Sequence, residues 1–413
     1  MRFLAALALL MLLAPAAAQA DWSGATPLAP AARDSYALGV AADLRDRPSA
    51  LVAVRTSSGW SLRLGARQIA ASRNGIEGAG LFAGRGNDLV AGWLQIIGGL
   101  RRPVVATGPR LADRQVLATG PRSTQVLRLA ANRSGDAVAA FWRYDGQAYA
   151  VYASYRPAGG RFQAPQLLGK GKVSNPAVAI DAGGTAAVAW NDPSGAHVAE
   201  WDAGAMAFGA PANVPSPTRP SSDPSVGIEG GHVVVSWLVG SIFSTRQVLV
   251  AERAAAGAAF AAPVAVSAAD VRIPHWITPS MSVHSGQVLV AWVQGVLHTT
   301  SRDRAALAVR SGDGPWQAPI LRGVSAPSHV YWVTLLGGAP GRPPILAMTT
   351  SRAYRFHLLT ATLRANGTLA PSRSVATGNT GFSPWLAQGR LRAWLAADRV
   401  TGPRHQALLF HST

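Results

Sequence analysis

The chain contains no cysteine in its 413 residues. Disulfide bonds, thiolate nucleophiles and Cys-ligated zinc or iron–sulfur sites are therefore excluded. Acidic residues are also scarce, because Asp and Glu together number 20 and the only glutamates are Glu77, Glu200, Glu229 and Glu252. That scarcity disfavours most two-carboxylate glycosidase mechanisms and any calcium site built from many carboxylates.

Long apolar runs are missing beyond the N-terminus. Residues 1–20 read MRFLAALALLMLLAPAAAQA, with an early Arg, an apolar stretch and small residues at Ala18 and Ala20. This pattern predicts a secretory signal peptide over residues 1–20, cleaved before Asp21. The apolar part is too short, and too interrupted by Pro15, for a good membrane span, and no later segment is long enough. We expect an exported protein, periplasmic or extracellular, with no membrane span.

Basic residues are in excess. Lys and Arg number 38, the formal net charge is +18, and the only lysines are Lys170 and Lys172. One interpretation is a surface that faces a polyanion. The other is a GC-rich genome, which favours Arg at solvated positions together with Ala, Gly and Pro. Export disfavours nucleic acid as the partner in spite of the charge.

A tryptophan recurs at the end of a short apolar run. It stands at positions 93, 142, 190, 237, 292 and 394, with Met348 in the one gap, at intervals of 49, 48, 47, 55, 56 and 46 residues. The unit from Asn175 to Val214 reads as four short strands separated by Gly, Asp and Pro. A period near fifty with four strands per unit is typical of β-propeller blades. We expect the tryptophans to fill space between blades.

A second marker follows the tryptophan in the central units: an aromatic residue, one further residue, then Ala-Pro, beginning at Phe162, Phe208, Phe260 and Trp316. Proline there fits an outer strand, where a missing N–H costs nothing. The related string DWSGATPLAP follows the leader, while the C-terminus supplies only inner strands. We therefore predict that Trp22 to Leu28 completes the last blade and closes the ring.

These patterns predict an all-β fold, a single β-propeller over residues 21–413. Counting one unit from Tyr36 to Ala70 and one for each marker gives eight four-stranded blades. If the short first unit merges with its neighbour, the ring has seven.

Ligands of propellers meet the face made by the inter-blade loops and by the loops between second and third strands. The inter-blade loops carry the basic residues Arg33, Arg73, Arg122, Lys170, Lys172, Arg219 and Arg272. The other loops add Arg55, Arg143, Arg302, Arg304, Arg352, Arg355, Arg399 and Arg404. The planar guanidinium matches carboxylate, sulfate or phosphate, so an anion site is predicted here; the alternative is a solvated surface with counterions.

The last blades add aromatic and imidazole side chains to the same face. His275, Trp276, His329 and Tyr331 fall at equivalent loop positions. Aromatic rings beside Arg and His suit a sugar that carries an acidic group. No third ligand is spaced to join His275 and His329, so we expect no metal site and no cofactor. The sequence also lacks a nucleophile elbow, GxGxxG, a P-loop and HExxH.

The strings YASYRPAGGRFQAPQLL and AVAIDAGGTAAVAWND resemble repeats of exported bacterial propellers of the sialidase-like, or Asp-box, superfamily. The nearest string to an Asp box is SGDGPW, Ser311 to Trp316, which lacks the Thr and is one residue short. The resemblance implies the propeller fold and export. The family's chemistry uses three Arg, a Tyr nucleophile assisted by Glu, and an Asp acid. No Tyr–Glu pair can be placed here, so catalysis is not carried over.

Three functions follow as hypotheses. The first is a non-enzymatic exported propeller that binds an acidic glycan or another polyanion at the Arg-rich face. The second is a degenerate sialidase-like glycoside hydrolase or lyase that acts on acidic glycans. The third is a scaffold whose rim docks another exported protein.

Overall fold

The computed structural model describes residues 22–23, 25–30, 33–241, 245–274, 277–296, 303–322, 328–337, 342–352, 355–380, 384–388, 392–401 and 404–412. The predicted signal peptide, residues 1–20, lies outside them.

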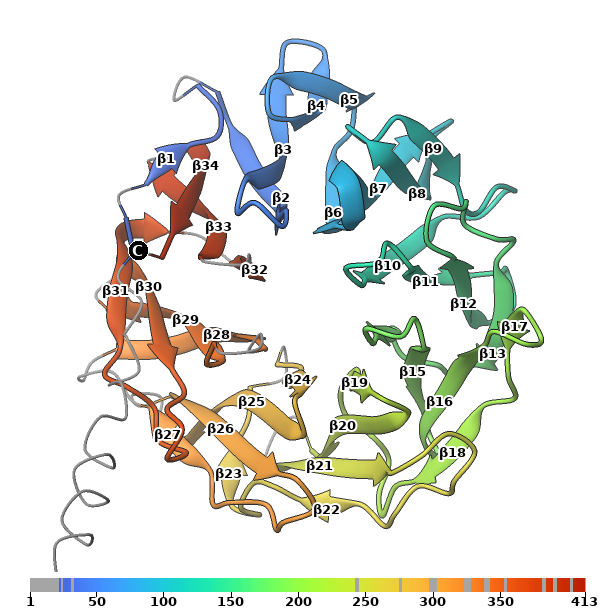
Figure 1. Ribbon diagram of the computed structural model, residues 1–413, viewed down its shortest axis with the longest axis vertical. Helices are drawn as coiled ribbons and strands as arrows, with labels where there is room; N and C mark the ends of the chain where they lie inside the picture. Colours follow the sequence, from blue (N-terminus) through green and yellow to red (C-terminus); the bar gives the residue numbers. More distant parts are fainter. Residues whose placement is uncertain are drawn as a thin grey trace, which may run out of the picture.

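Eight antiparallel blades surround a central opening, as Figure 1 shows. Blades 1 to 4 consist of β2 (Ser35–Ala42), β3 (Pro48–Thr56), β4 (Gly59–Leu64) and β5 (Arg67–Ser72); β6 (Ile76–Ala83), β7 (Asp88–Ile97), β8 (Leu100–Pro109) and β9 (Asp113–Val116); β10 (Thr124–Ala131), β11 (Ala137–Tyr144), β12 (Tyr149–Arg156) and β13 (Gln166–Gly171); and β14 (Ala177–Ile180), β15 (Ala186–Asp192), β16 (Gly195–Asp202), β17 (Ala207–Phe208) and β18 (Ala212–Pro215).

Blades 5 to 8 consist of β19 (Ser225–Glu229), β20 (His232–Gly240), β21 (Arg246–Arg253) and β22 (Val264–Ala265); β23 (Val271–Arg272), β24 (Ser280–His284), β25 (Gln287–Val296), β26 (Arg304–Ser311) and β27 (Ile320–Arg322); β28 (Ser328–Leu336), β29 (Ile345–Arg352), β30 (Arg355–Thr362) and β31 (Arg373–Thr380); and β32 (Trp385–Gln388), β33 (Ala393–Thr401), β34 (Arg404–His411) and β1 (Thr26–Pro27). The end of β31 also pairs with β33. A 3-10 turn, Arg85–Asn87, joins β6 to β7. No helix in the described ranges has the length and apolarity needed to cross a membrane.

The N-terminal strand closes the ring, as the sequence predicts. Thr26 of β1 lies opposite Leu409 of β34, and an isolated bridge joins Trp22 to Ser412. The Trp22 indole also donates a hydrogen bond to Thr360 Oγ1 (2.8 Å), in the neighbouring blade. Figure 1 shows β1 beside β34 at the junction with blade 1. Closure from both ends of the chain leaves no open sheet edge at this junction, and the count of eight blades is confirmed.

The second strand of each blade forms the core, because neighbouring blades cover both of its faces. Trp93, Trp237, Trp292 and Met348 are fully buried, which confirms the expected role of the recurring marker. Buried indoles need an acceptor: Trp93 donates to Gln95 Oε1 and Trp292 to Gln294 Oε1. Trp142 differs, because it is only partly buried at the end of β11.

The Ala-Pro marker leads into the outermost strand. Pro165, Pro263 and Pro319 directly precede β13, β22 and β27, where the missing N–H interrupts no ladder. The side-chain amide of a glutamine then links the outer strands of two adjacent blades. Gln166 of blade 3 accepts from Phe208 N and donates to Phe208 O of blade 4, both at 2.8 Å. This amide satisfies both backbone groups of a rim residue in the next blade.

Candidate functional site

The inter-blade connections and the loops between second and third strands lie at one end of the ring, because every blade has the same strand order. Four of the predicted arginines are on these connections: Arg33 precedes β2, Arg73 follows β5, Arg122 precedes β10 and Arg219 precedes β19. The fifth, Arg272, is in the short strand β23. All except the partly buried Arg272 are exposed. They are spread over blades 1 to 6, so the structure does not gather them into a single binding site.

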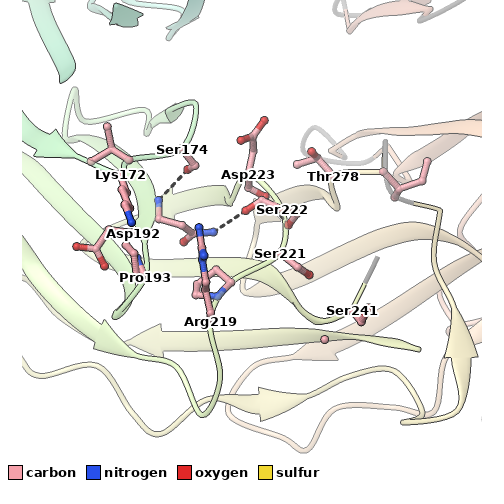
Figure 2. Close-up of a pocket in the computed structure, with 15 residues that line it drawn as sticks. Lys172, Ser174, Asp192, Pro193, Arg219, Ser221, Ser222, Asp223, Ser241 and Thr278 are labelled. Atoms are coloured by element: carbon pink, nitrogen blue, oxygen red, sulfur yellow. Dashed lines mark hydrogen bonds between the residues drawn. The ribbon is translucent and has the colours of Figure 1, made fainter. Parts of the chain in front are cut away.

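A pocket on this face brings together blades 4, 5 and 6 (Figure 2). Its volume is about 820 Å³. It is lined by Lys172, Val173, Ser174, Asn191, Asp192, Pro193, Arg219, Pro220, Ser221, Ser222, Asp223, Gly240, Ser241, Ile277 and Thr278. This volume is within the range of small-ligand sites. Of the five predicted arginines, only Arg219 lines it.

Two cationic side chains of the pocket have no partner. Lys172 and Arg219 are both exposed, and within the described part of the chain neither side chain makes a hydrogen bond or an ion pair. The nearby Lys170, by contrast, is paired with Asp145 at 2.7 Å. The charges of Lys172 and Arg219 are therefore available to a ligand.

The two carboxylates of the pocket are already engaged by the protein. Asp223 accepts from Asn175 N (3.2 Å) and Asn175 Nδ2 (2.8 Å). Asp192 Oδ2 lies 2.9 Å from His197 Nε2, and Asp192 Oδ1 accepts from Ser194 N at 2.7 Å. Burial acts to raise the pKa of Asp192, but the bonds from Ser194 and His197 outweigh it and lower that pKa. Both carboxylates remain acceptors at the edge of the pocket, without neutralising the unpaired cations.

A buried guanidinium lies directly behind the pocket wall. Arg246, at the start of β21, is 1% exposed. Its Nε donates to Ser221 Oγ (3.1 Å), and its Nη1 donates to Pro274 O (2.9 Å). No carboxylate pairs with it among the described residues. Burial lowers the pKa of Arg246 to about 10, so that the group stays charged at neutral pH. A buried charge without a counter-ion is costly, and here two of its hydrogen bonds end on Ser221, a residue of the pocket lining.

Asn191 forms the wall between blades 4 and 5. Its backbone N–H donates to Ser174 Oγ (2.9 Å), and its Nδ2 donates to Ser222 O (2.8 Å), the two bonds dashed in Figure 2. The side chain is 3% exposed, and its Oδ1 has no donor within the described residues. Because these bonds fix which end of the amide faces Ser222, the unpaired atom is the acceptor.

A second group of predicted residues meets between blades 6 and 7. Arg272 Nη2 donates to Asp303 Oδ1 at 2.5 Å, and His329 Nδ1 lies 3.9 Å from Asp303 Oδ2. The rings of His329 and Tyr331 are 6.3 Å apart, edge to face. Asp303 thus occupies the anion position beside Arg272, so this arginine is not available to a ligand in the way that Arg219 is. His275 and Trp276 lie outside the described residues.

A third group lies where blade 8 meets blade 1. Asp398 Oδ1 accepts from Ala37 N (2.7 Å), and Asp34 Oδ1 accepts from His405 N (2.6 Å). The Tyr36 ring lies 4.5 Å from His405. Burial, together with the charge of Asp34, raises the pKa of Asp398 to about 7, against the bond from Ala37 that lowers it. Burial and the charges of Asp34 and Asp398 also raise the pKa of Tyr36.

Metal ligands do not converge in the described ranges: no group of three or more His, Asp or Glu side chains there could hold a metal ion.

No protein-family model matches the sequence, and no curated protein matches it. Solved structures share its fold. The Dos1 propeller aligns over 94% of this chain and 95% of its own, with a TM-score of 0.51 and 11% identity. The polysaccharide lyase Uly1 aligns over 92% of this chain and 97% of its own, with a TM-score of 0.49 and 10% identity.

A neuraminidase-like protein from the influenza virus of a flat-faced bat from Peru aligns over 70% of this chain and 87% of its own, with a TM-score of 0.39 and 12% identity. Sialidase-like and polysaccharide lyase propellers are thus among the structures that align with this chain. At these identities the likeness shows the fold and transfers no residue role.

Two residues that shape the pocket, Asn191 and Arg246, were not among those predicted from the sequence, whereas Lys172 and Arg219 were. Arg246 stands in the strand RQVLVAER, where nothing marks it as buried beside a neighbouring loop. Asn191 follows Trp190 and reads as part of a turn. Asp398 follows the apolar run AWLAA, and only the packing of blade 8 on blade 1 distinguishes it from the other aspartates.

Proposed function

We propose that the protein is a binding protein for an acidic carbohydrate, held in the pocket between blades 4, 5 and 6. The single observation that carries this proposal is the pair of unpartnered cations, Lys172 and Arg219, in a pocket backed by the buried charge of Arg246.

The acceptors around these cations favour a sugar over a simple anion. Asp192 and Asp223 stand at the rim with lone pairs that can accept hydroxyl donors. A simple anion such as phosphate would meet the cations but would offer few donors to the two carboxylates. A sugar acid offers both chemistries, since its carboxylate or sulfate pairs with Lys172 and Arg219 and its hydroxyls donate to the acids.

We propose further that binding takes place outside the cytoplasm. The support is the leader pattern of residues 1–20, with its basic start, apolar stretch and small residues before Asp21. An exported protein meets acidic glycans at cell surfaces and in matrix polymers.

The test is calorimetric titration of the protein with oligogalacturonate and with its neutral counterpart. We expect the acidic ligand to bind and the neutral one not to bind. Replacing Arg219 by Met should weaken binding by about 10-fold to 100-fold, as expected for the loss of one charge-assisted contact. Lys172→Met should act in the same direction, and binding should weaken as salt rises because exposed charges are screened.

Arg85→Met is the matched control, because Arg85 is an exposed arginine of the turn between β6 and β7, at the opposite end of the ring. It removes the same charge from the whole molecule and should leave the affinity unchanged. Equal weakening by Arg85→Met would assign binding to net charge instead of to the pocket. Capture of a protein partner that persists in Arg219→Met, without any glycan binding, would favour the docking scaffold.

A second candidate function is turnover of an acidic glycan at the junction of blades 8 and 1. The observation that favours it is a carboxyl with a pKa raised to about 7, Asp398, next to Tyr36 and His405. Such a group can donate or accept a proton near neutral pH. Asp398→Asn should then abolish product formation while the affinity measured at the pocket stays the same. If the protein forms no product from acidic glycans at any pH between 5 and 9, this second function is ruled out.

A further inference from the structure

Two exposed tyrosines, Tyr144 and Tyr149, form an aromatic platform at the connection between β11 and β12 of blade 3, beside the pocket. Tyr144 at the end of β11 and Tyr149 at the start of β12 are each 39% exposed, although both are large aromatic side chains. Tyr149 stacks on Trp142 with ring centroids 4.1 Å apart and an interplanar angle of 14°. Tyr144 lies at 5.2 Å from Tyr149, and its hydroxyl donates to Gly146 O (3.0 Å). These bonds and stacks hold the exposed rings in place.

The register of blade 3 shows which way the platform faces. Tyr144 pairs with Tyr149, and Tyr149 pairs with Gly171 of β13, so these positions share one face of the sheet. Gly169 is on the same face, two residues earlier, and a Cβ there would come within 2.7 Å of the Trp190 indole of blade 4. The platform therefore faces blade 4. The next residue after Gly171 is Lys172, which lines the pocket.

Unpaired cations flank the platform. Arg122 packs its guanidinium against Gly146, where a Cβ would lie 2.8 Å from Nη2. The Arg122 side chain, like that of Lys172, makes no hydrogen bond or ion pair within the described part of the chain. Cross-strand packing accounts for the contact of Trp142 with Tyr149. It does not account for two exposed tyrosines close to two cations that have no counter-ion among the described residues.

We propose that the ligand is a chain of acidic sugars, with one unit in the pocket and a neighbouring unit stacked on Tyr144 and Tyr149; this rests on the function proposed above. Sugar rings stack their C–H faces on aromatic rings, and their acidic groups pair with Arg122 and Lys172. Lys172 lines the pocket and directly follows Gly171, the cross-strand partner of Tyr149, so it borders both subsites. An acidic peptide could satisfy the cations but would offer no repeating ring for the platform.

The test compares galacturonate with its di-, tetra- and hexasaccharide in calorimetric titrations. Affinity should rise with chain length in the unmodified protein. Tyr149→Ala should cost about fivefold in affinity for the hexasaccharide, as expected for one lost ring contact, and should leave the affinity for galacturonate unchanged. Tyr149→Phe keeps the ring and should behave as the unmodified protein.

Leu167→Ala is the control for loss of an exposed apolar side chain, because Leu167 is 50% exposed on the outer strand of the same blade. Affinity that does not depend on chain length, or a Tyr149→Ala loss of equal size for galacturonate and hexasaccharide, would overturn the platform while leaving the pocket intact. Failure of every acidic saccharide to bind would instead overturn the function on which the platform rests.

Discussion

Replacing Asp398 by Asn should stabilise the protein at alkaline pH and not at acidic pH. Asp398 is on β33 and accepts a hydrogen bond from Ala37 N, so it joins blade 8 to blade 1 where the ring closes. Asn keeps an oxygen that can accept this bond. What the substitution removes is the charge, whose burial near Asp34 raises the pKa of Asp398 to about 7.

The sign follows from proton binding. The folded state holds a proton on Asp398 up to a pH of about 7, whereas the unfolded chain releases it near the ordinary aspartate pKa of 3.8. Between these values the folded state binds more protons, so stability falls as the pH rises. A difference of about three pKa units corresponds to at most about 4 kcal/mol. The penalty is absent below the unfolded pKa and complete above the folded one.

The assay is denaturant unfolding of both proteins at several pH values between 4 and 8. The gain in the free energy of unfolding of Asp398→Asn over the unmodified protein should grow from near zero at pH 4 to a few kcal/mol at pH 8. Asp43→Asn is the control of opposite sign. Burial acts to raise the pKa of Asp43, but hydrogen bonds from Arg47 and Arg45 lower it, so that variant should lose stability above the unfolded pKa. If the difference in free energy of unfolding between Asp398→Asn and the unmodified protein does not change with pH, the raised pKa of Asp398 is contradicted.

Three further predictions follow. Arg246→Met should cost about 1–3 kcal/mol in the free energy of unfolding, because Ser221 O and Pro274 O lose their donor; equal stability in urea titrations would contradict it. The same variant should also bind oligogalacturonate more weakly, with a loss that persists at high salt because buried charges are poorly screened. Gln166→Leu should lower stability by about 2 kcal/mol, because Phe208 N and O lose their partners; Gln247→Leu, on another strand, serves as the comparison.

The fold could be predicted from the sequence because each blade repeats the same pattern of buried and edge strands. A strand covered on both faces must be apolar and ends in a large filler, and Trp93, Trp237 and Trp292 fill that place. The outer strand tolerates Pro before it, as at Pro165. The closing strand was predictable because the string at Asp21 to Pro30 had no inner strands before it.

For the site, the sequence predicted which loops share one face of the ring, but not how the side chains on that face pair with one another. Arg219 fell in the pocket because inter-blade loops share one end of the ring. Arg272 is not available to a ligand, because Asp303 from the next loop pairs with it. Such a contact depends on side-chain packing, which cannot be predicted from the spacing of residues in the sequence. Arg246 lies in an ordinary strand pattern, and its burial depends on the loop that carries Pro274. Tyr144 and Tyr149 read as strand residues, and only their exposure distinguishes them from core.

The most direct test of the central claim is a crystal structure of the protein with an acidic hexasaccharide. We predict ligand density in the pocket between blades 4, 5 and 6, with a carboxylate oxygen about 3 Å from Lys172 Nζ or from the Arg219 guanidinium. Density on another surface, or a ligand in the pocket whose acidic groups point away from both cations, would contradict it.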